Sequence, residues 1–417
     1  MSRRIAGLLS GMIASLGLVG AASAQDLVVS NARILVGDGR VIERGSVVVQ
    51  GGKIISVAAG PPASAPPRAQ RIDATGMTVM PGFIDDHRHL VYGPADKWFA
   101  TTAATEMREL LEAGYTTVQS GGDETAAIVK LKRMVESGAL KGPRIVAAGW
   151  TLVGELKTEA EVRSAIRATI AAGVDSIAEI IYPAKANPFS PTELETRNLA
   201  IAIDEANKAK IPVQIHAVSP AAMVEAVRLG GKELIHTPHY GWVTDAQAKA
   251  VKDAGARVSS CVGFGAPVFG VFNQENKPTF RDGKSWPENI AGGEGRGREA
   301  GYKPVNARTL FDNGVTLGFC TDTNYNATAA LAQELKVLNL TFSPIDMVKI
   351  MGPNSAAVLG RTDIGELKTG SLADMVVLAG NPLDGYWNFL TAVVVVKGGV
   401  VMVDKRAQLH PVPALRP

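Results

Sequence analysis

One pattern recurs from residue 78 to about residue 360 and limits the folds open to this chain. It consists of a β-branched apolar run, a polar helix, and a glycine just before the next run. The eight runs are MTVMPGFID, YTTVQSG, RIVAAG, DSIAEII, IPVQIHA, ELIHTP, ARVSSCVGF and VTLGFCTD. Strands and helices that alternate in this way form parallel sheets with apolar strands buried on both faces. Eight repeats predict an α/β fold of the (β/α)8, or TIM-barrel, type over residues 78–362.

Local signals mark where the helices between these runs begin and end. Capping-box or proline-at-N1 patterns predict helix starts at Thr158, Ser190, Ser219 and Ser343. Glycines that can adopt the left-handed conformation predict helix ends at Gly114, Gly173, Gly230, Gly255 and Gly314. The helices therefore fall between the apolar runs, as a barrel requires.

The segments on either side of this region have a different pattern. Residues 25–77 and 363–410 contain short β-rich runs joined by glycine turns, as antiparallel hairpins do. Neither segment is long enough to form a secure core alone, so we predict one small composite β-sandwich. Within the barrel, the strand and helix pattern lapses over residues 264–303, which predicts a lid-like loop above the C-terminal ends of the strands.

The first 24 residues carry the features of a secretory signal. Arg3 and Arg4 precede the uncharged run IAGLLSGMIASLGLVG, and Ala22-Ser23-Ala24 forms a small-x-small cleavage pattern. The prediction is a periplasmic or secreted protein; an uncleaved membrane anchor is the alternative, although the run is short for a span of about 20 residues. Cleavage lowers the net charge from +3 to +1. This balance favours neither nucleic acid nor stable membrane association.

Five of the six histidines stand where a metal-dependent enzyme would need them. His87 and His89 form an H-x-H at the end of the first run, and His216, His236 and His239 close the fifth and sixth runs. Side chains alternate along a strand, so both imidazoles of an H-x-H face the same side. In a (β/α)8 barrel the active site lies at the C-terminal ends of the strands. Imidazole together with carboxylate suits zinc, so we expect Zn2+ or another divalent cation.

Four longer stretches share a pattern. They are PGFIDDHRHL at 81–90, the His216 strand with the helix that leads to His236, TDT at 321–323, and NSAAVLGRTDIGELKTGSLADMVVL at 354–378. Together they resemble the amidohydrolase superfamily, in particular its imidazolonepropionase-like and Xaa-Pro-dipeptidase-like branch. The resemblance implies that His87 and His89 bind one metal. It implies that Asp322 ligates the same metal and acts as the catalytic general base, and that His216 and His236 bind a second metal.

The fourth run departs from the pattern of many relatives. Where these carry a carbamylated lysine that bridges two metals, this chain has Ala178, followed by Glu179. A shift of one residue along a strand moves a side chain to the opposite face, so Glu179 is no simple replacement unless a bulge re-aims it. We favour Glu179 as a bridging ligand of two ions; the alternatives are a single-ion site with Glu179 beside it, and a purely structural glutamate.

Other residues near the strand ends are candidates for substrate binding. Tyr182 follows the fourth run, and His239 and Tyr240 follow the sixth; for His239 a surface-loop position is the alternative. Arg88 alternates away from the two ligand histidines, which predicts packing or pairing outside the site.

Two cysteines, Cys261 and Cys320, lie in the seventh and eighth runs, which are neighbours in a barrel. A disulfide between them is one alternative. We favour buried free thiols, because free cysteine behaves as a small hydrophobe.

These features together predict a secreted, metal-dependent amidohydrolase. Its substrate class is an N-acyl amino acid or a dipeptide-like amide, and a homo-oligomer is compatible with the sequence. The alternatives on the same site are a lactonase or esterase, a cyclic-amidine hydrolase or deaminase, a lyase or isomerase, and a non-catalytic binding protein.

Overall fold

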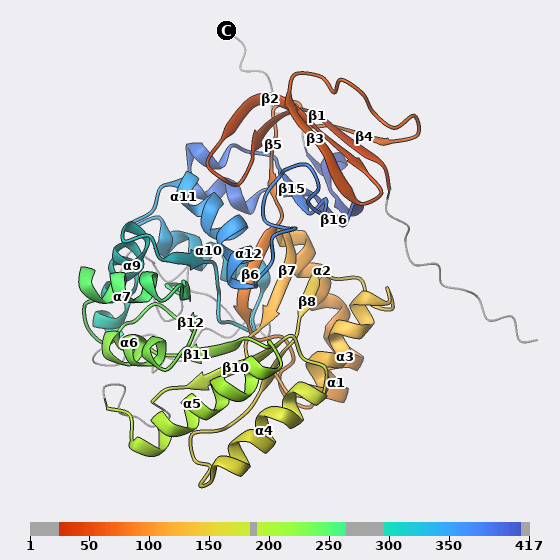
Figure 1. Ribbon diagram of the computed structural model, residues 1–417. Coiled ribbons are helices and arrows are strands. Elements are labelled where there is room, and N and C mark those ends of the chain that lie inside the picture. The colour runs from red at the N-terminus through yellow and green to blue at the C-terminus, as the bar shows by residue number, and fades with distance from the viewer. Residues whose placement is uncertain (1–24, 184–189, 264–295, 410–417) are drawn as a thin grey trace, which may run out of the picture.

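The computed structural model describes residues 25–183, 190–263 and 296–409, in which a ring of parallel strands and helices lies below a separate β-sheet (Figure 1). The predicted signal segment, residues 1–24, lies outside the described residues. So does most of the predicted lid-like loop. From residue 296 the chain is helical, so the prediction of a loop up to residue 303 is wrong for its last residues.

Nine strands form the barrel-like part. They are β6 (Phe83–Arg88), β7 (Tyr115–Ser120), β8 (Arg144–Val146), β9 (Ala148–Trp150), β10 (Ser176–Ile181), β11 (Val213–His216), β12 (Glu233–Ile235), β13 (Arg257–Ser259) and β14 (Thr316–Gly318). All neighbouring pairs are parallel, as predicted, but the ladder is not one closed eight-stranded ring: β6-β7-β8 form one sheet and β9 to β14 another. The third run is interrupted at Ala147, because β8 pairs with β7 and β9 pairs with β10.

Individual backbone hydrogen bonds bring the first and last strands of this ring together. The Asp86 amide donates to the Phe319 carbonyl at 2.9 Å, and the Asp322 amide donates to the His87 carbonyl at 3.0 Å. The result is a TIM-barrel-like α/β fold in which residues of the first strand meet residues that follow the last strand.

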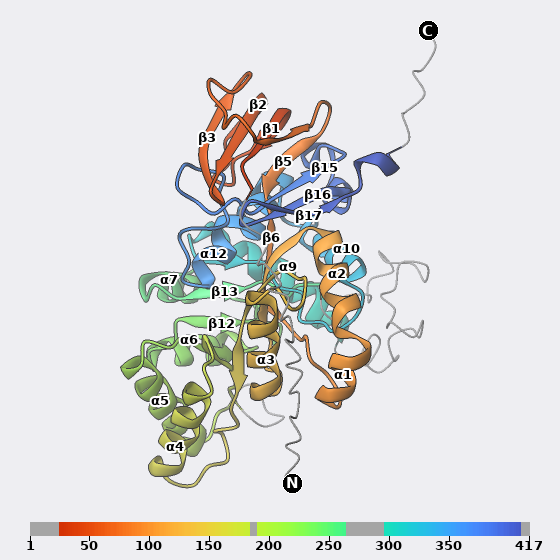
Figure 2. The same cartoon turned by 90° about the vertical axis from the view of Figure 1, so that its right-hand side faces the viewer.

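Helices follow the strands around the outside (Figures 1 and 2). They are α1 (Ala95–Thr101), α2 (Ala103–Ala113), α3 (Thr125–Glu136), α4 (Glu159–Ala171), α5 (Glu193–Lys208), α6 (Pro220–Arg228), α7 (Asp245–Asp253), α9 (Arg296–Asp312), α10 (Ala327–Leu338), α11 (Pro344–Lys349) and α12 (Ser355–Val358), with a π turn at Ile350–Asn354. The predicted N-caps Thr158, Ser219 and Ser343 are confirmed. The prediction at Ser190 is wrong: α5 is capped by Thr192, which forms a capping box with Glu195.

The two flanking segments join as predicted, but in one continuous sheet. Strands β1 (Leu27–Leu35), β2 (Val41–Gln50), β3 (Lys53–Ala59), β4 (Gln70–Asp73) and β5 (Thr78–Pro81) come from the N-terminal segment, and β15 (Met375–Leu378), β16 (Ala392–Lys397) and β17 (Val400–Asp404) from the C-terminal one. Their order is β17-β16-β15-β5-β1-β2-β3, with β4 beside β1, so hydrogen bonds do not divide them into the two sheets of a sandwich. Three short 3-10 helices, Pro382–Asp384, Tyr386–Leu390 and Arg406–Gln408, complete the described residues.

The first apolar run crosses from this sheet into the barrel-like part. Its first half is β5 of the flanking sheet, and its second half is β6, so the barrel begins at Phe83 rather than at residue 78. Gly82 lies at the crossing, where an added Cβ would come within 2.2 Å of the Thr116 side chain. Only glycine, which has no Cβ, leaves room for the Thr116 side chain here. Within the described part of the chain, no helix is both long and apolar enough to cross a membrane.

Candidate metal centre

Four histidines and two carboxylates meet at the C-terminal ends of five strands. They are His87 and His89 from β6 and the residues after it, Glu179 from β10, His216 from β11, His236 after β12, and Asp322 after β14. Subsets of these six place their nitrogen and oxygen atoms within 4.8 Å of one another, close enough for a single ion. The structure therefore brings together every residue predicted to bind metal.

Asp322 is at one side of this group. Its Oδ1 atom lies 3.1 Å from His89 Nε2 and 3.4 Å from His87 Nε2, and its Oδ2 atom lies 3.8 Å from His236 Nδ1. The backbone of Asp322 has φ of 51°, a conformation that side chains other than glycine rarely adopt. Burial opposes ionisation, but the nearby imidazoles of His236, His87 and His89 hold the pKa of this carboxyl well below its usual range.

Glu179 is at the other side, and a bulge in β10 places it there. The ladder between β10 and β11 slips between Ile177 and Ile180, and Glu179 has φ of 36°. Its Oε1 atom lies 2.9 Å from His216 Nδ1 and 3.7 Å from His236 Nε2. Its Oε2 atom lies 3.9 Å from His89 Nε2. One carboxylate therefore reaches histidines of both predicted pairs, as a bridging ligand must.

Several imidazole nitrogens of this group make no hydrogen bond with any described residue. Both ring nitrogens of His87 and the Nε2 atom of His236 are buried and unpartnered. His87 is fully buried, so two unpaired ring nitrogens would be costly there without a ligand. Imidazoles and carboxylates are the donors that zinc takes. The residues present thus fit a divalent cation.

The titration behaviour of the histidines differs according to their neighbours. Burial alone would lower the pKa of His89, but the hydrogen bond and charge of Asp322 and the charge of Glu179 raise it to about 9. Burial, together with the neighbouring His216, lowers the pKa of His236 to about 4. His236 is therefore a neutral imidazole near pH 7, the form in which histidine binds a metal.

A buried guanidinium holds the turn that carries Asp322. Arg88 is 2% exposed, and its Nη1 atom donates to Thr321 Oγ1 at 3.0 Å and to Thr323 Oγ1 at 2.9 Å. Its Nη2 atom donates to the carbonyl oxygen of Tyr325. Asp85 Oδ2 accepts a hydrogen bond from Thr321 Oγ1 at 2.6 Å. Arg88 points away from the ligands, as predicted, yet it contacts the residues on both sides of Asp322.

Asp123, at the end of the β7 strand and absent from the predicted site, supports the loop after His89. Its carboxylate accepts hydrogen bonds from the amides of Leu90 and Val91, all between 3.0 and 3.1 Å. Burial raises its pKa to about 6, against the opposing charge of His89. The sequence GGDE at 121–124 gave no signal for this role, because the partners of Asp123 are backbone amides, which nearly every residue carries.

The residues predicted to bind substrate differ in their burial and in their contacts. Tyr182 is almost fully buried, and its hydroxyl is hydrogen-bonded to that of Thr196 in α5 at 3.0 Å. His239 and Tyr240 are half-buried, and their rings contact each other at 4.6 Å between centroids with a tilt of 41°. Burial and the nearby charge of Lys303 lower the pKa of His239.

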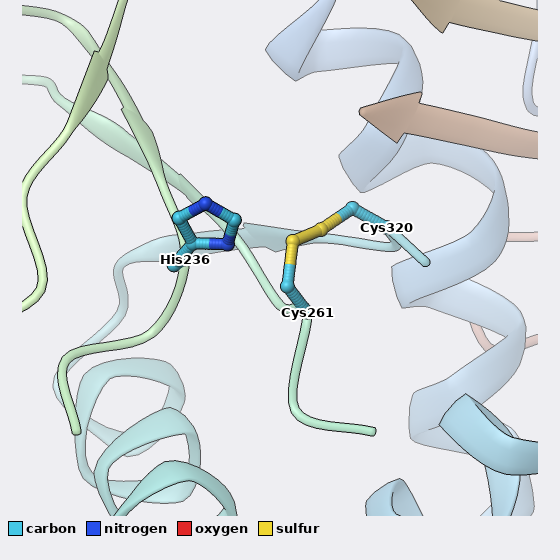
Figure 3. A group of neighbouring side chains, drawn as sticks. All are labelled: His236, Cys261 and Cys320. Carbon is cyan, nitrogen blue, oxygen red and sulfur yellow. A yellow bond between two sulfur atoms is a disulfide. The ribbon is translucent and has the colours of Figure 1, made fainter. Parts of the chain in front are cut away.

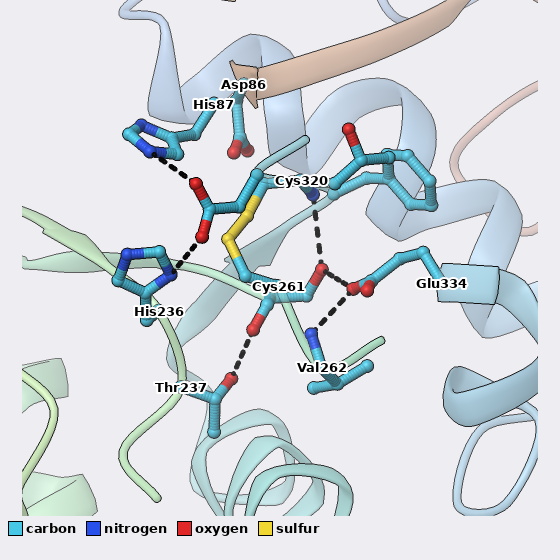
Figure 4. Close-up of a disulfide and its surroundings, with 12 residues drawn as sticks. Asp86, His87, His236, Thr237, Cys261, Val262, Cys320 and Glu334 are labelled. Atoms are coloured by element: carbon cyan, nitrogen blue, oxygen red, sulfur yellow. Dashed lines mark hydrogen bonds and ion pairs between the residues drawn. A yellow bond between two sulfur atoms is a disulfide. The ribbon is translucent and has the colours of Figure 1, made fainter. Parts of the chain in front are cut away.

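Cys261 and Cys320 are joined by a disulfide, so the expectation of free thiols is wrong (Figure 4). They follow β13 and β14, which are hydrogen-bonded neighbours through Ser259 and Gly318. The Cα atoms are 4.8 Å apart, a separation within the range of disulfides. The sequence placed the two runs side by side but did not fix which way each side chain points.

Comparison with known proteins assigns this site to a class. The amidohydrolase family profile matches residues 78–257 and 303–403, and the chain belongs to this family. It is 26% identical over 377 residues to the imidazolonepropionase of Salinispora arenicola, covering 80% of this chain and 85% of that protein. It is 25% identical over 428 residues to the imidazolonepropionase of Geobacillus thermodenitrificans, covering 88% and 92%.

Solved structures share the fold. The crystal structure of an amidohydrolase aligns with a TM-score of 0.74 at 25% identity, covering 92% of this chain and all of that one. A Xaa-Pro dipeptidase with bound methionine aligns with a TM-score of 0.72 at 22% identity, covering 90% and 99%. Family membership makes this protein a hydrolase of carbon–nitrogen bonds, in a family that typically depends on divalent metal.

Proposed function

We propose that this protein hydrolyses the amide bond of an N-acyl amino acid or a dipeptide-like compound at a centre formed by His87, His89, His216, His236, Glu179 and Asp322. The observation that carries the proposal is the buried, unpartnered imidazole of His87 opposite the ionised carboxylate of Asp322, 3.4 Å away. We further propose Zn2+ as the metal, with two ions if Glu179 bridges them and otherwise one.

The roles of the residues follow from their positions. A bound divalent cation supplies a Lewis acid that acidifies water and polarises an amide carbonyl. Asp322 is ionised at neutral pH because its histidine neighbours lower its pKa, so it can take a proton from the attacking water. It then delivers that proton to the departing nitrogen, without which an amine is a poor leaving group.

Access to the centre is from the side of His89 and His216. Their side chains are 33% and 26% exposed, whereas His87 and His236 are nearly inaccessible. A substrate therefore approaches over the exposed pair, where His239 and Tyr240 are candidates to contact it. Tyr182 is a weaker candidate, because its hydroxyl is bonded to Thr196.

A second candidate function is the opening of a cyclic amide or amidine. It is supported by the similarity to imidazolonepropionases, which covers 80% and 88% of this chain in the two relatives described. The same Asp322 would serve both reactions, because each adds water to a carbon–nitrogen bond. The two differ in products: a cyclic substrate gives one ring-opened molecule, and an acyl amino acid gives an acid and a free amine.

The test is a product analysis on purified, zinc-loaded protein. A panel of N-acyl amino acids, dipeptides and cyclic amides is incubated and analysed by mass spectrometry and amine detection. Release of free amino acid that disappears in Asp322→Asn supports the amide hydrolase. Ring opening alone replaces it with the second candidate, and no turnover of any substrate by fully metal-loaded protein rejects both.

The cellular setting is a proposal as well. We propose that residues 1–24 direct export and that the mature protein acts in the periplasm or outside the cell on small molecules, without nucleic acid or membrane as a partner. Homo-oligomerisation is compatible with this setting. N-terminal sequencing of protein isolated from its own cells, and fractionation of those cells, test the proposal; an intact N-terminus in the cytoplasm contradicts it.

A further inference from the structure

A second group of potential ligands lies directly beside the hydrolytic centre. It consists of His236, Cys261 and Cys320, whose nitrogen and sulfur atoms lie within 4.8 Å of one another (Figure 3). Both cysteines are fully buried, and together with Ile235 they form a small separate apolar cluster. The two cysteine side chains and the imidazole therefore converge on one buried spot, with each residue contributed by a different strand end.

The imidazole in this group has unused bonding capacity. Its Nδ1 atom is on the side of the two sulfur atoms (Figure 3), with Asp322 Oδ2 3.8 Å away. Its Nε2 atom is buried without a hydrogen-bond partner among the described residues and lies 3.7 Å from Glu179 Oε1. Two thiolates and one imidazole form a ligand set that suits zinc and other thiophilic cations. The disulfide withholds both sulfur ligands, because a bridged sulfur carries no negative charge.

We propose that reduction of the Cys261–Cys320 disulfide opens a thiolate-rich metal site, with His236 as its third ligand, for Zn2+ or a similar thiophilic divalent cation. This inference goes beyond carbon–nitrogen bond hydrolysis: the thiolate site itself does not depend on that reaction, and only its effect on activity rests on the proposed function. A phosphine reductant breaks the sulfur–sulfur bond and becomes a phosphine oxide with oxygen from water, leaving two thiols. A protein dithiol does the same by thiol exchange and becomes a disulfide itself. Each thiol then gives its proton to solvent as the cation binds.

The shared imidazole couples the two sites. His236 belongs to this group and to two of the groups that form the hydrolytic centre. A cation held by the two thiolates draws His236 away from Glu179 and Asp322. Hydrolytic activity therefore falls when a reduced, thiolate-bound cation is present, and it returns when the disulfide re-forms. In an oxidising compartment the bridged form predominates.

The experiment uses the full-length mature protein stripped of metal. One sample stays oxidised, the other is reduced with a phosphine and desalted without oxygen, and both receive Co2+. We expect a thiolate-to-cobalt charge-transfer absorption in the near ultraviolet and one additional ion per chain in the reduced sample only. The double variant Cys261→Ser/Cys320→Ser lacks both signals. In contrast, His89→Asn keeps the absorption, because His89 is outside this group.

Two results overturn the proposal. One is equal ion content with no charge-transfer absorption in the reduced protein, which leaves the disulfide as a crosslink between β13 and β14. The other is alkylation of both thiols of the reduced wild-type protein at the same rate with and without Zn2+; this measurement decides the question even if the serine variant does not fold. Amide turnover by the oxidised protein is measured separately, so failure of the proposed function is distinguishable from failure of this site.

Discussion

Arg88→Met tests whether the position of Asp322 depends on a buried guanidinium. The substitution introduces an apolar side chain of similar length and removes three hydrogen bonds, those to Thr321, Thr323 and the carbonyl of Tyr325. Removal of one partner from a buried charged network costs about 3–5 kcal/mol of unfolding free energy. We expect a loss of this size, because Arg88 is 2% exposed and water cannot replace the lost donors.

The same change is expected to lower activity beyond its effect on stability. Thr321 and Thr323 flank Asp322, whose positive φ is held by the surrounding bonds. Small displacements of a catalytic group cost about 100-fold in rate. The kcat of the folded protein is therefore expected to fall by about that factor, with a smaller change in KM.

Denaturant unfolding gives the loss of unfolding free energy. Steady-state kinetics, at a temperature where the variant is folded, gives the change in kcat and KM. Arg228→Met is the matched control: this arginine is 65% exposed and, among the described residues, forms its ion pair with Glu225 on the same helix, so its loss costs less than about 1 kcal/mol. An Arg88→Met protein that is destabilised but keeps wild-type kcat and metal content refutes the positioning role.

Three more substitutions test other parts of the site. Glu179→Ala is expected to lower the bound metal by one ion per chain, as measured by elemental analysis after dialysis; unchanged content excludes a bridge. Asp322→Asn in metal-saturated protein is expected to lower kcat by about 100-fold or more, because proton transfer is lost, and activity near that of wild type would remove Asp322 from catalysis. Glu233 is 5% exposed in β12, and burial raises its pKa from 4.5 to about 8 against the charge of Arg257. The folded state thus keeps a proton that the unfolded chain releases, and stability falls as pH rises from about 4.5 to 8. Glu233→Gln should be as stable as wild type at pH 4 and more stable at pH 9, by at most about 5 kcal/mol at 1.4 kcal/mol per pKa unit; a difference in melting temperature that does not change with pH contradicts this.

Much of the barrel-like part could be predicted because its signals are local. A capping box needs only four residues, and the pattern at Thr158 and Glu161 gives the observed cap. At residues 190–195 two start signals compete, and the box of Thr192 with Glu195 determines the helix start instead of Ser190. Where two neighbouring capping patterns are of similar strength, only the packing of the helix on the strands beneath it decides which one begins the helix.

Features that depend on pairing between distant strands could not be predicted. The break at Ala147 and the division of the first run at Gly82 follow from which sheet each half can join. The hydrogen bonds that hold the turn of Asp322 also join distant parts of the sequence, because Arg88 and Thr321 are 233 residues apart. The histidine ligands and Asp322 could be predicted, since each stands near or after the end of a strand, and any parallel barrel brings these ends to the same mouth. Glu179 lies within β10 and reaches the site only through the bulge in that strand.

Backbone strain gives an argument for the site that does not use the identity of its side chains. Among the described residues, six that are not glycine have positive φ: Asn31, Glu179, Lys210, His236, Cys261 and Asp322. Four of the six belong to the hydrolytic centre or to the adjoining cysteine pair, although these occupy a small part of the chain. Such conformations cost about 1–3 kcal/mol each and persist where the surroundings fix them. For Glu179 the cause is visible, because the bulge in β10 sets the backbone conformation that turns its carboxylate from the face predicted by strict alternation to the face of the histidines. A fold that maintains this strain at the ends of β10, β12, β13 and β14 is organised around the convergence of these residues, and a bound cation is the interaction that can offset it.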